Sequence, residues 1–140
     1  MKILFVCAGN TGRSPMAQFV MQKLVKDAGL SDKISIDSAA SKPTDGGNLH
    51  EGIAMKLRLE EIPFESHTAR TITTADYFKN DLIICMDAGN VEQVKDICGG
   101  DPDKKVQMLL PTDIPWDKHG FAKTYDDILR GCQKLLATIA

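Results

Sequence analysis

Five residues separate a cysteine, Cys7, from an arginine, Arg13, close to the start of the chain, and two of the five are glycines. Glycines let the backbone turn with its N–H groups pointing inward, and a helix that begins after the loop adds unpaired N–H groups and the positive end of its dipole. The planar guanidinium of Arg13 can donate to two oxygens of a tetrahedral anion at once. We therefore expect a loop that binds phosphate or sulfate, formed by Ala8, Gly9, Asn10, Thr11, Gly12, Arg13 and Ser14.

The sulfur of Cys7 is predicted to lie at the base of this loop. A positive field of this kind favours the thiolate over the thiol, and a thiolate that faces a bound phosphoryl group is a nucleophile. Ser14 can donate a hydrogen bond to the sulfur, and Pro15 suits the first turn of a helix because its φ is fixed and it has no N–H. A cysteine near the end of a strand is often only a small buried apolar residue, but the glycines and the Ser-Pro pair favour a catalytic role.

This loop requires a strand before it and a helix after it. Residues 2–6 form a short apolar run rich in β-branched residues, and apolar residues resume at helical spacing over residues 15–28, before Gly29. Cys7 then stands at the carboxyl end of a buried strand, which is where ligands bind in an open α/β sheet.

Strand and helix patterns alternate along the rest of the chain, which indicates a parallel sheet. The helix expected at residues 50–61 is predicted to bury Ile53, Leu57 and either Met55 or Leu59, and Asp87 is predicted to cap the helix that follows it. We predict one domain over residues 1–140, an α/β three-layer sandwich with a four-stranded parallel sheet and helices on both faces. The further strands are expected at residues 33–40, 81–86 and 105–109, and the further helices at residues 73–78, 88–98 and 121–139.

The overall composition excludes several classes of partner. A net charge of −2 gives no global field that would attract nucleic acid or an anionic membrane. No apolar stretch approaches the ~20 residues of a membrane span, and the segment before Cys7 lacks the anatomy of a signal peptide. We therefore expect neither a nucleic-acid nor a membrane partner, and a cytoplasmic location.

The four cysteines are Cys7, Cys85, Cys98 and Cys132. They contain no close pair, so they match neither a secreted disulfide framework nor a zinc site. We expect reduced thiols and no metal, and Cys85 is expected to be a core residue of its strand.

Several segments resemble the low-molecular-weight protein tyrosine phosphatase family, and the resemblance extends over nearly the whole chain. The most specific segment is the N-terminal one, Phe5-Val6-Cys7, Gly9-Asn10 and Arg13-Ser14-Pro15-Met16-Ala17. The others are Ile62-Pro63, Ser66-His67-Thr68-Ala69-Arg70, Ile84-Cys85-Met86-Asp87 with Asn90, and, weakly, Asp113-Ile114-Pro115. The resemblance implies a cysteine-dependent phosphatase that hydrolyses phosphotyrosine in proteins through a phosphocysteine intermediate, without a cofactor. It also implies that His67 orders the phosphate-binding loop.

The chain departs from the family at two places. Many members carry a second cysteine directly before the arginine, able to form a disulfide with the nucleophile, whereas this chain has Gly12 there. The family's general acid is an aspartate followed by a proline and aromatic residues, but an alignment through Asp113 and Pro115 places Trp116 at the position of that aspartate. We favour Asp117 as the acid after a shift of one residue, with Asp113 as the alternative; a third possibility is that neither reaches the leaving group. Trp116 is expected to line the substrate cleft.

Three other functions stay open. Thr11 resembles the residue that protein arginine phosphatases of the same family carry, so phosphoarginine is an alternative substrate. Arsenate reductase, a redox enzyme on the same fold, needs further cysteines for thiol exchange, and the spacing of Cys85 and Cys98 does not suit it. A catalytically weakened phosphate-binding module is the remaining class.

Overall fold

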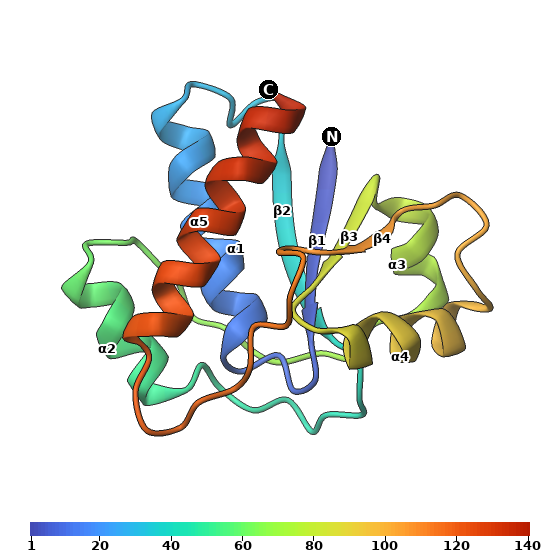
Figure 1. Cartoon of the computed structure of the whole chain (residues 1–140), viewed down its shortest axis with the longest axis horizontal. Coiled ribbons are helices and arrows are strands. Elements are labelled where there is room, and N and C mark those ends of the chain that lie inside the picture. Colours follow the sequence, from blue (N-terminus) through green and yellow to red (C-terminus); the bar gives the residue numbers. More distant parts are fainter.

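A computed structural model describes residues 1–140 as a four-stranded parallel sheet in the order β2-β1-β3-β4, with helices on both faces (Figure 1). This confirms the predicted α/β class and the predicted layers. In chain order the elements are β1 (Lys2–Cys7), α1 (Arg13–Asp27), β2 (Ser35–Ala40), α2 (Glu51–Leu59), α3 (Thr74–Lys79), β3 (Leu82–Cys85), α4 (Ala88–Cys98), β4 (Val106–Met108) and α5 (Ala122–Ile139).

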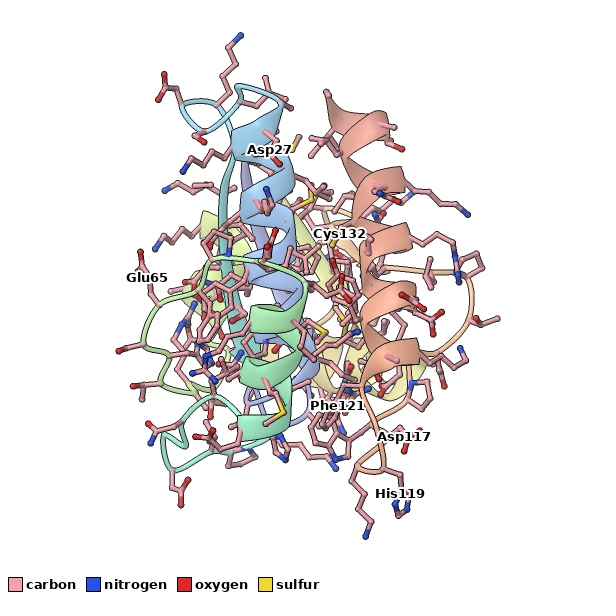
Figure 2. All side chains as sticks on the ribbon, turned by 90° about the vertical axis from the view of Figure 1, so that its left-hand side faces the viewer. Asp27, Glu65, Asp117, His119, Phe121 and Cys132 are labelled. Atoms are coloured by element: carbon pink, nitrogen blue, oxygen red, sulfur yellow. The ribbon has the colours of Figure 1, made fainter.

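Strand β1 is buried on both faces and separates two apolar cores. Its side chains alternate, so that Ile3, Phe5 and Cys7 belong to the larger core and Leu4 and Val6 to the smaller one. Helices α1, α2 and α5 cover the larger core, whereas α3 and α4 cover the smaller one (Figure 1). Figure 2 shows α1 and α5 side by side, with α2 in front of them.

The order of the strands reverses at β1. The chain runs from β1 to β2 on one side of it and returns to β3 on the other. Crossover connections that leave a central strand in opposite directions open a crevice beyond its carboxyl end. Cys7 is the last residue of β1, so residues 8–12 and the N-terminus of α1 lie at this crevice.

The expected helix boundaries agree with the structure to within two residues, but some residues expected to be buried are exposed. Met55 and Leu59 are 60% and 71% exposed. Successive residues of a helix are rotated by about 100°, so Met55 lies about 200° from Ile53 and Leu57, which do face the core. Ala28, the last residue of the run expected to form the first helix, lies just past the end of α1 and is exposed.

Both termini lie at the amino ends of the strands, at the opposite end of the molecule from the loop that follows Cys7 (Figure 1). The amino group of Met1 donates to the carbonyl of Lys33, which holds the first residue beside the start of β2. None of the helices has the length and the apolar content needed to cross a bilayer.

Candidate active site

A pocket of about 300 Å³ opens above Cys7 at the carboxyl end of β1. The phosphate-binding loop predicted from the sequence forms most of its lining. The expected loop residues are all there apart from Ser14, which lies behind the pocket against the sulfur. The residues that line the pocket are Cys7, Ala8, Gly9, Asn10, Thr11, Gly12, Arg13 and Trp116.

The sulfur of Cys7 has two hydrogen-bond donors within the loop. The hydroxyl oxygen of Ser14 lies 3.0 Å from it, and the backbone N–H of Asn10 donates to it over 3.2 Å. The side-chain amide of Asn10 donates to the Ser14 oxygen, so the hydroxyl hydrogen of Ser14 is free to point at the sulfur. A thiolate accepts two such bonds better than a thiol does, because bonds to a charged partner are stronger.

Asn10 fixes the shape of the loop. Its φ of 56° is left-handed, a conformation that asparagine tolerates better than most residues. Its amide donates to both Ser14 and Ser38, and its backbone carbonyl lies 2.7 Å from Nε2 of His67. The His67 contact agrees with the loop-ordering role that the family resemblance implied.

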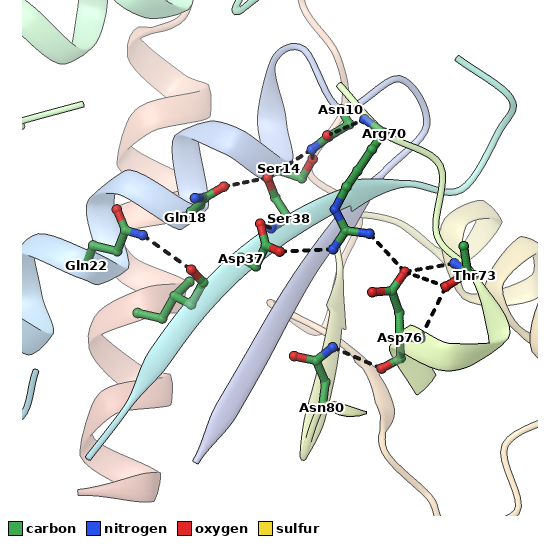
Figure 3. Close-up of polar contacts among 11 residues, drawn as sticks. Asn10, Ser14, Gln18, Gln22, Asp37, Ser38, Arg70, Thr73, Asp76 and Asn80 are labelled. Carbon is green, nitrogen blue, oxygen red and sulfur yellow. Dashed lines mark hydrogen bonds and ion pairs between the residues drawn. The ribbon is translucent and has the colours of Figure 1, made fainter. Parts of the chain in front are cut away.

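A chain of polar contacts continues from Asn10 to the neighbouring elements (Figure 3). The Arg70 backbone N–H donates to Oδ1 of Asn10, and its guanidinium binds Asp37 on β2 and Asp76 on α3, each at 2.9 Å. Burial alone would raise the pKa of Asp76, but the Arg70 guanidinium and the Thr73 N–H and hydroxyl outweigh burial and lower it. The loop is thus braced by β2 and α3 as well as by its own residues.

Arg13 is almost fully buried and is held at one end of its guanidinium. Its Nη1 donates to Asp87 at 2.7 Å and to the carbonyl of Ile114 at 2.8 Å, whereas Nε and Nη2 have no protein partner and are not shut off from solvent. Asp87 also accepts from the Asn90 N–H and caps α4, as predicted. The second contact, to Arg13, was not predicted from the sequence, because 74 positions separate the two residues.

Neither candidate for the general acid lines the pocket. The Asp113 carboxylate accepts from the Ala88 N–H at the start of α4. The Asp117 carboxylate accepts from the His119 N–H within its own turn. Both residues are exposed, and Asp117 and His119 lie at the tip of the loop that precedes α5 (Figure 2).

Trp116 lies against the phosphate-binding loop, as expected for a residue of the cleft. Its ring centroid is 5.2 Å from that of His50 and 5.2 Å from that of Phe121. The loop of residues 41–48 does not line the pocket, although its Gly47 lies next to the side chain of Thr11.

The three cysteines outside the pocket are buried and unpaired. Burial raises the pKa of all three thiols, that of Cys85 to about 12. No group of three or more His, Cys, Asp or Glu side chains lies together as metal ligands would.

Comparison with known proteins gives consistent matches over nearly the whole chain. A family model described as low molecular weight phosphotyrosine protein phosphatase matches residues 2–140. Low molecular weight protein-tyrosine-phosphatase YfkJ of Bacillus subtilis is 35% identical over 98% of this chain and 94% of its own, and its crystal structure covers 99% of this chain and 94% of that chain with a TM-score of 0.94. The low molecular weight phosphotyrosine protein phosphatase of Rattus norvegicus is 33% identical over 96% of this chain and 92% of its own. The crystal structure of SP-PTP, a low molecular weight protein tyrosine phosphatase from Streptococcus pyogenes, is 34% identical and covers 99% of this chain and 93% of that chain with a TM-score of 0.91.

Proposed function

The chain belongs to the low molecular weight phosphotyrosine protein phosphatase family and is a cysteine-dependent phosphatase, and we propose that Cys7 and Arg13 are its catalytic residues and phosphorylated proteins its substrates. The observation that carries the proposal is the sulfur of Cys7 in the pocket, with the Ser14 hydroxyl and the Asn10 N–H against it and Arg13 lining the same pocket.

In the proposed reaction the Cys7 thiolate attacks the phosphorus atom, and the bond from phosphorus to the tyrosine oxygen breaks. Water then hydrolyses the S–P bond and returns the thiolate with release of phosphate. Nη1 of Arg13 is occupied by Asp87 and Ile114, so Nε and Nη2 are the donors left for two phosphoryl oxygens. Such donors stabilise the charge that develops in the transition state at no cost of reorganisation.

The leaving oxygen also needs a proton, and we propose Asp117 as its donor, with Asp113 as the alternative. Asp113 is bound to the N-terminus of α4, a neighbouring element, whereas the only bond of Asp117 is to His119 in the same turn. Asp117 is therefore free to move with that turn without breaking a hydrogen bond to the rest of the fold.

The assignment of the acid is tested by the pH dependence of kcat for Asp117→Asn and Asp113→Asn on an aryl phosphate. General acids contribute about 10²–10⁴-fold, and we expect Asp117→Asn to lose that factor together with the limb of the pH–rate profile that reports the acid. If only Asp113→Asn loses that limb, Asp113 is the donor.

The function itself is tested by a rapid-mixing burst assay with para-nitrophenyl phosphate. The wild-type protein is expected to release one equivalent of nitrophenol per Cys7 and then turn over steadily. Cys7→Ser is expected to lose at least about 10³-fold in turnover, because it removes the nucleophile, and to keep its affinity for inorganic phosphate. Phosphate binding without a burst in the wild-type protein would instead favour a non-catalytic phosphate-binding module.

A second substrate, phosphoarginine, is favoured by one observation. The short, polar side chain of Thr11 lines the pocket, with Gly47 packed behind it. Parallel measurement of kcat/KM on a phosphotyrosine and a phosphoarginine peptide distinguishes the two substrates. Arsenate reduction is disfavoured, because Cys85 and Cys98 are buried and burial raises the pKa of both thiols.

A further inference from the structure

Gly12 leaves room for the indole ring of Trp116. A Cβ atom on Gly12 would lie 2.2 Å from Cζ3 of that ring and 2.8 Å from Cη2, far inside van der Waals contact. The φ of Gly12 is −130°, so a left-handed backbone is not the reason for glycine at this position. The ring of Trp116 leaves no space for a side chain at position 12.

The indole of Trp116 also contacts two other rings, while the residue stays 41% exposed. It packs against His50 and Phe121, whose rings also contact each other at 5.3 Å between centroids. Phe121 is itself pressed on a second glycine, since a Cβ on Gly52 would lie 2.3 Å from its ring. We refer to His50, Trp116 and Phe121 as the aromatic wall.

We propose that Gly12 is a positioning residue that seats Trp116 beside the pocket, and that this pair gives the site its preference for planar leaving groups. The inference rests on the proposed function, because it concerns the leaving group of the same reaction. A flat indole face beside the phosphoryl group offers a stacking surface to a phenol ring and none of comparable size to a methyl group. Stacking of this kind corresponds to about 2- to 12-fold in affinity.

Binding without turnover provides the test. Isothermal titration calorimetry gives the affinities of phenylphosphonate, methylphosphonate and inorganic phosphate for the wild-type protein and for Gly12→Ala, Trp116→Ala and the double variant. Gly120→Ala is the matched control. Gly120 lies in the same loop as Trp116, and a Cβ atom on it would meet nothing within 4 Å. Trp116 is the only tryptophan of the chain, so its emission reports directly whether Gly12→Ala displaces the ring.

The wild-type protein and Gly120→Ala are expected to bind phenylphosphonate several-fold more tightly than methylphosphonate. This ratio of affinities is expected to be larger than the ratio in Trp116→Ala. Gly12→Ala is expected to shift the tryptophan emission to the red and to lose the preference to the same extent as Trp116→Ala. In the double variant Gly12→Ala should add nothing, and Trp116→Phe should restore part of the preference.

Two outcomes overturn the proposal. One is a Gly12→Ala protein that keeps both the wild-type emission and the wild-type preference. The other is a loss of phosphate affinity on Gly12→Ala that persists in the Trp116→Ala background, which would show that Gly12 acts on the phosphate-binding loop directly. If Gly12→Ala does not fold, an unchanged preference in Trp116→Ala overturns the proposal by itself. Because phosphonates are not hydrolysed, failure here is distinguishable from an absence of phosphatase activity.

Discussion

Only one of the two groups that donate to the sulfur of Cys7 can be removed by a substitution, because the other is the backbone N–H of Asn10. A hydrogen bond to a charged partner contributes about 1.5–3 kcal/mol. We expect Ser14→Ala to lower kcat by roughly 10- to 10²-fold and to slow the inactivation of Cys7 by iodoacetate at neutral pH. Ser35→Ala, on the exposed start of β2, is the control; equal rates in the two variants would contradict the role of Ser14.

Arg13 is oriented by the carboxylate of Asp87 and the carbonyl of Ile114, and only the carboxylate can be changed by a substitution. The side chains of Arg13 and Asp87 are 8% and 23% exposed, so the loss of the charge on Asp87 is poorly compensated by water. We expect Asp87→Asn to lower kcat/KM on an aryl phosphate by roughly 10- to 10²-fold and to change the unfolding free energy much less, because asparagine also caps helices well. Asp96→Asn, exposed on the same helix, is the control, and a matched loss of activity there would argue against the Arg13 contact.

At this scale the sequence predicted the residues of the pocket better than their supports. Cys7, Arg13 and Ser14 lie where a loop between a strand and a helix must put them. Ser38 and Asp87 lie in other elements, and no local pattern connects them to the loop. A signal for Asn10 was available, because an asparagine between glycine-containing turns is typical of a left-handed φ.

The elements themselves carry local signals that proved reliable. Asp87 caps α4 as expected, Thr73 caps α3, and Gly29 and Gly99 end α1 and α4 with positive φ. Caps and terminal glycines act through bonds to residues three or four positions away, so the sequence alone predicts them. Which side of α2 faces the core was harder to predict, since nine residues contain too few turns to define a stripe.

The start of α3 makes the stability of the fold sensitive to acid. Asp76 accepts from the Thr73 N–H and pairs with Arg70, and these bonds outweigh burial and keep its pKa below the ordinary value of 3.8. A lowered pKa stabilises the folded state above about pH 4, and that contribution disappears as the pH falls through the lowered value. We expect Asp76→Asn to cost about 1–2 kcal/mol at pH 7 and less at pH 3, as measured by urea unfolding. For Asp32→Asn, at an exposed turn, we expect the same small change in unfolding free energy at pH 7 and at pH 3. A cost of Asp76→Asn that does not depend on pH would contradict the lowered pKa of Asp76.

Across the whole molecule all four thiols are buried, but they differ in their surroundings. Cys85, Cys98 and Cys132 lie in the cores, where burial raises their pKa, whereas Cys7 lines the pocket. We expect a short exposure to iodoacetamide at pH 7 to modify Cys7 alone, with protection by inorganic phosphate, and unfolding in urea to expose all four. Peptide mass spectrometry identifies the sites; rapid native labelling of Cys85 would contradict the packing of β3.

The alternating strand and helix patterns along the chain were enough to predict the layered architecture. They did not predict how the loop between β4 and α5 is arranged beside the pocket. The loop between β4 and α5 has no periodicity, and the place of Trp116 depends on the absence of a side chain at Gly12, more than 100 positions earlier. Contacts of this kind depend on tertiary packing, which a pattern of apolar and polar residues does not encode.

The position of the two chain ends has a practical consequence. Because both emerge opposite the phosphate-binding loop (Figure 1), an affinity handle or a fluorescent fusion on either end should leave the pocket open to a large phosphorylated partner. Immobilisation of the protein on a sensor chip through such a handle would therefore present the active site to the flowing solution, an orientation suited to screening candidate phosphoproteins.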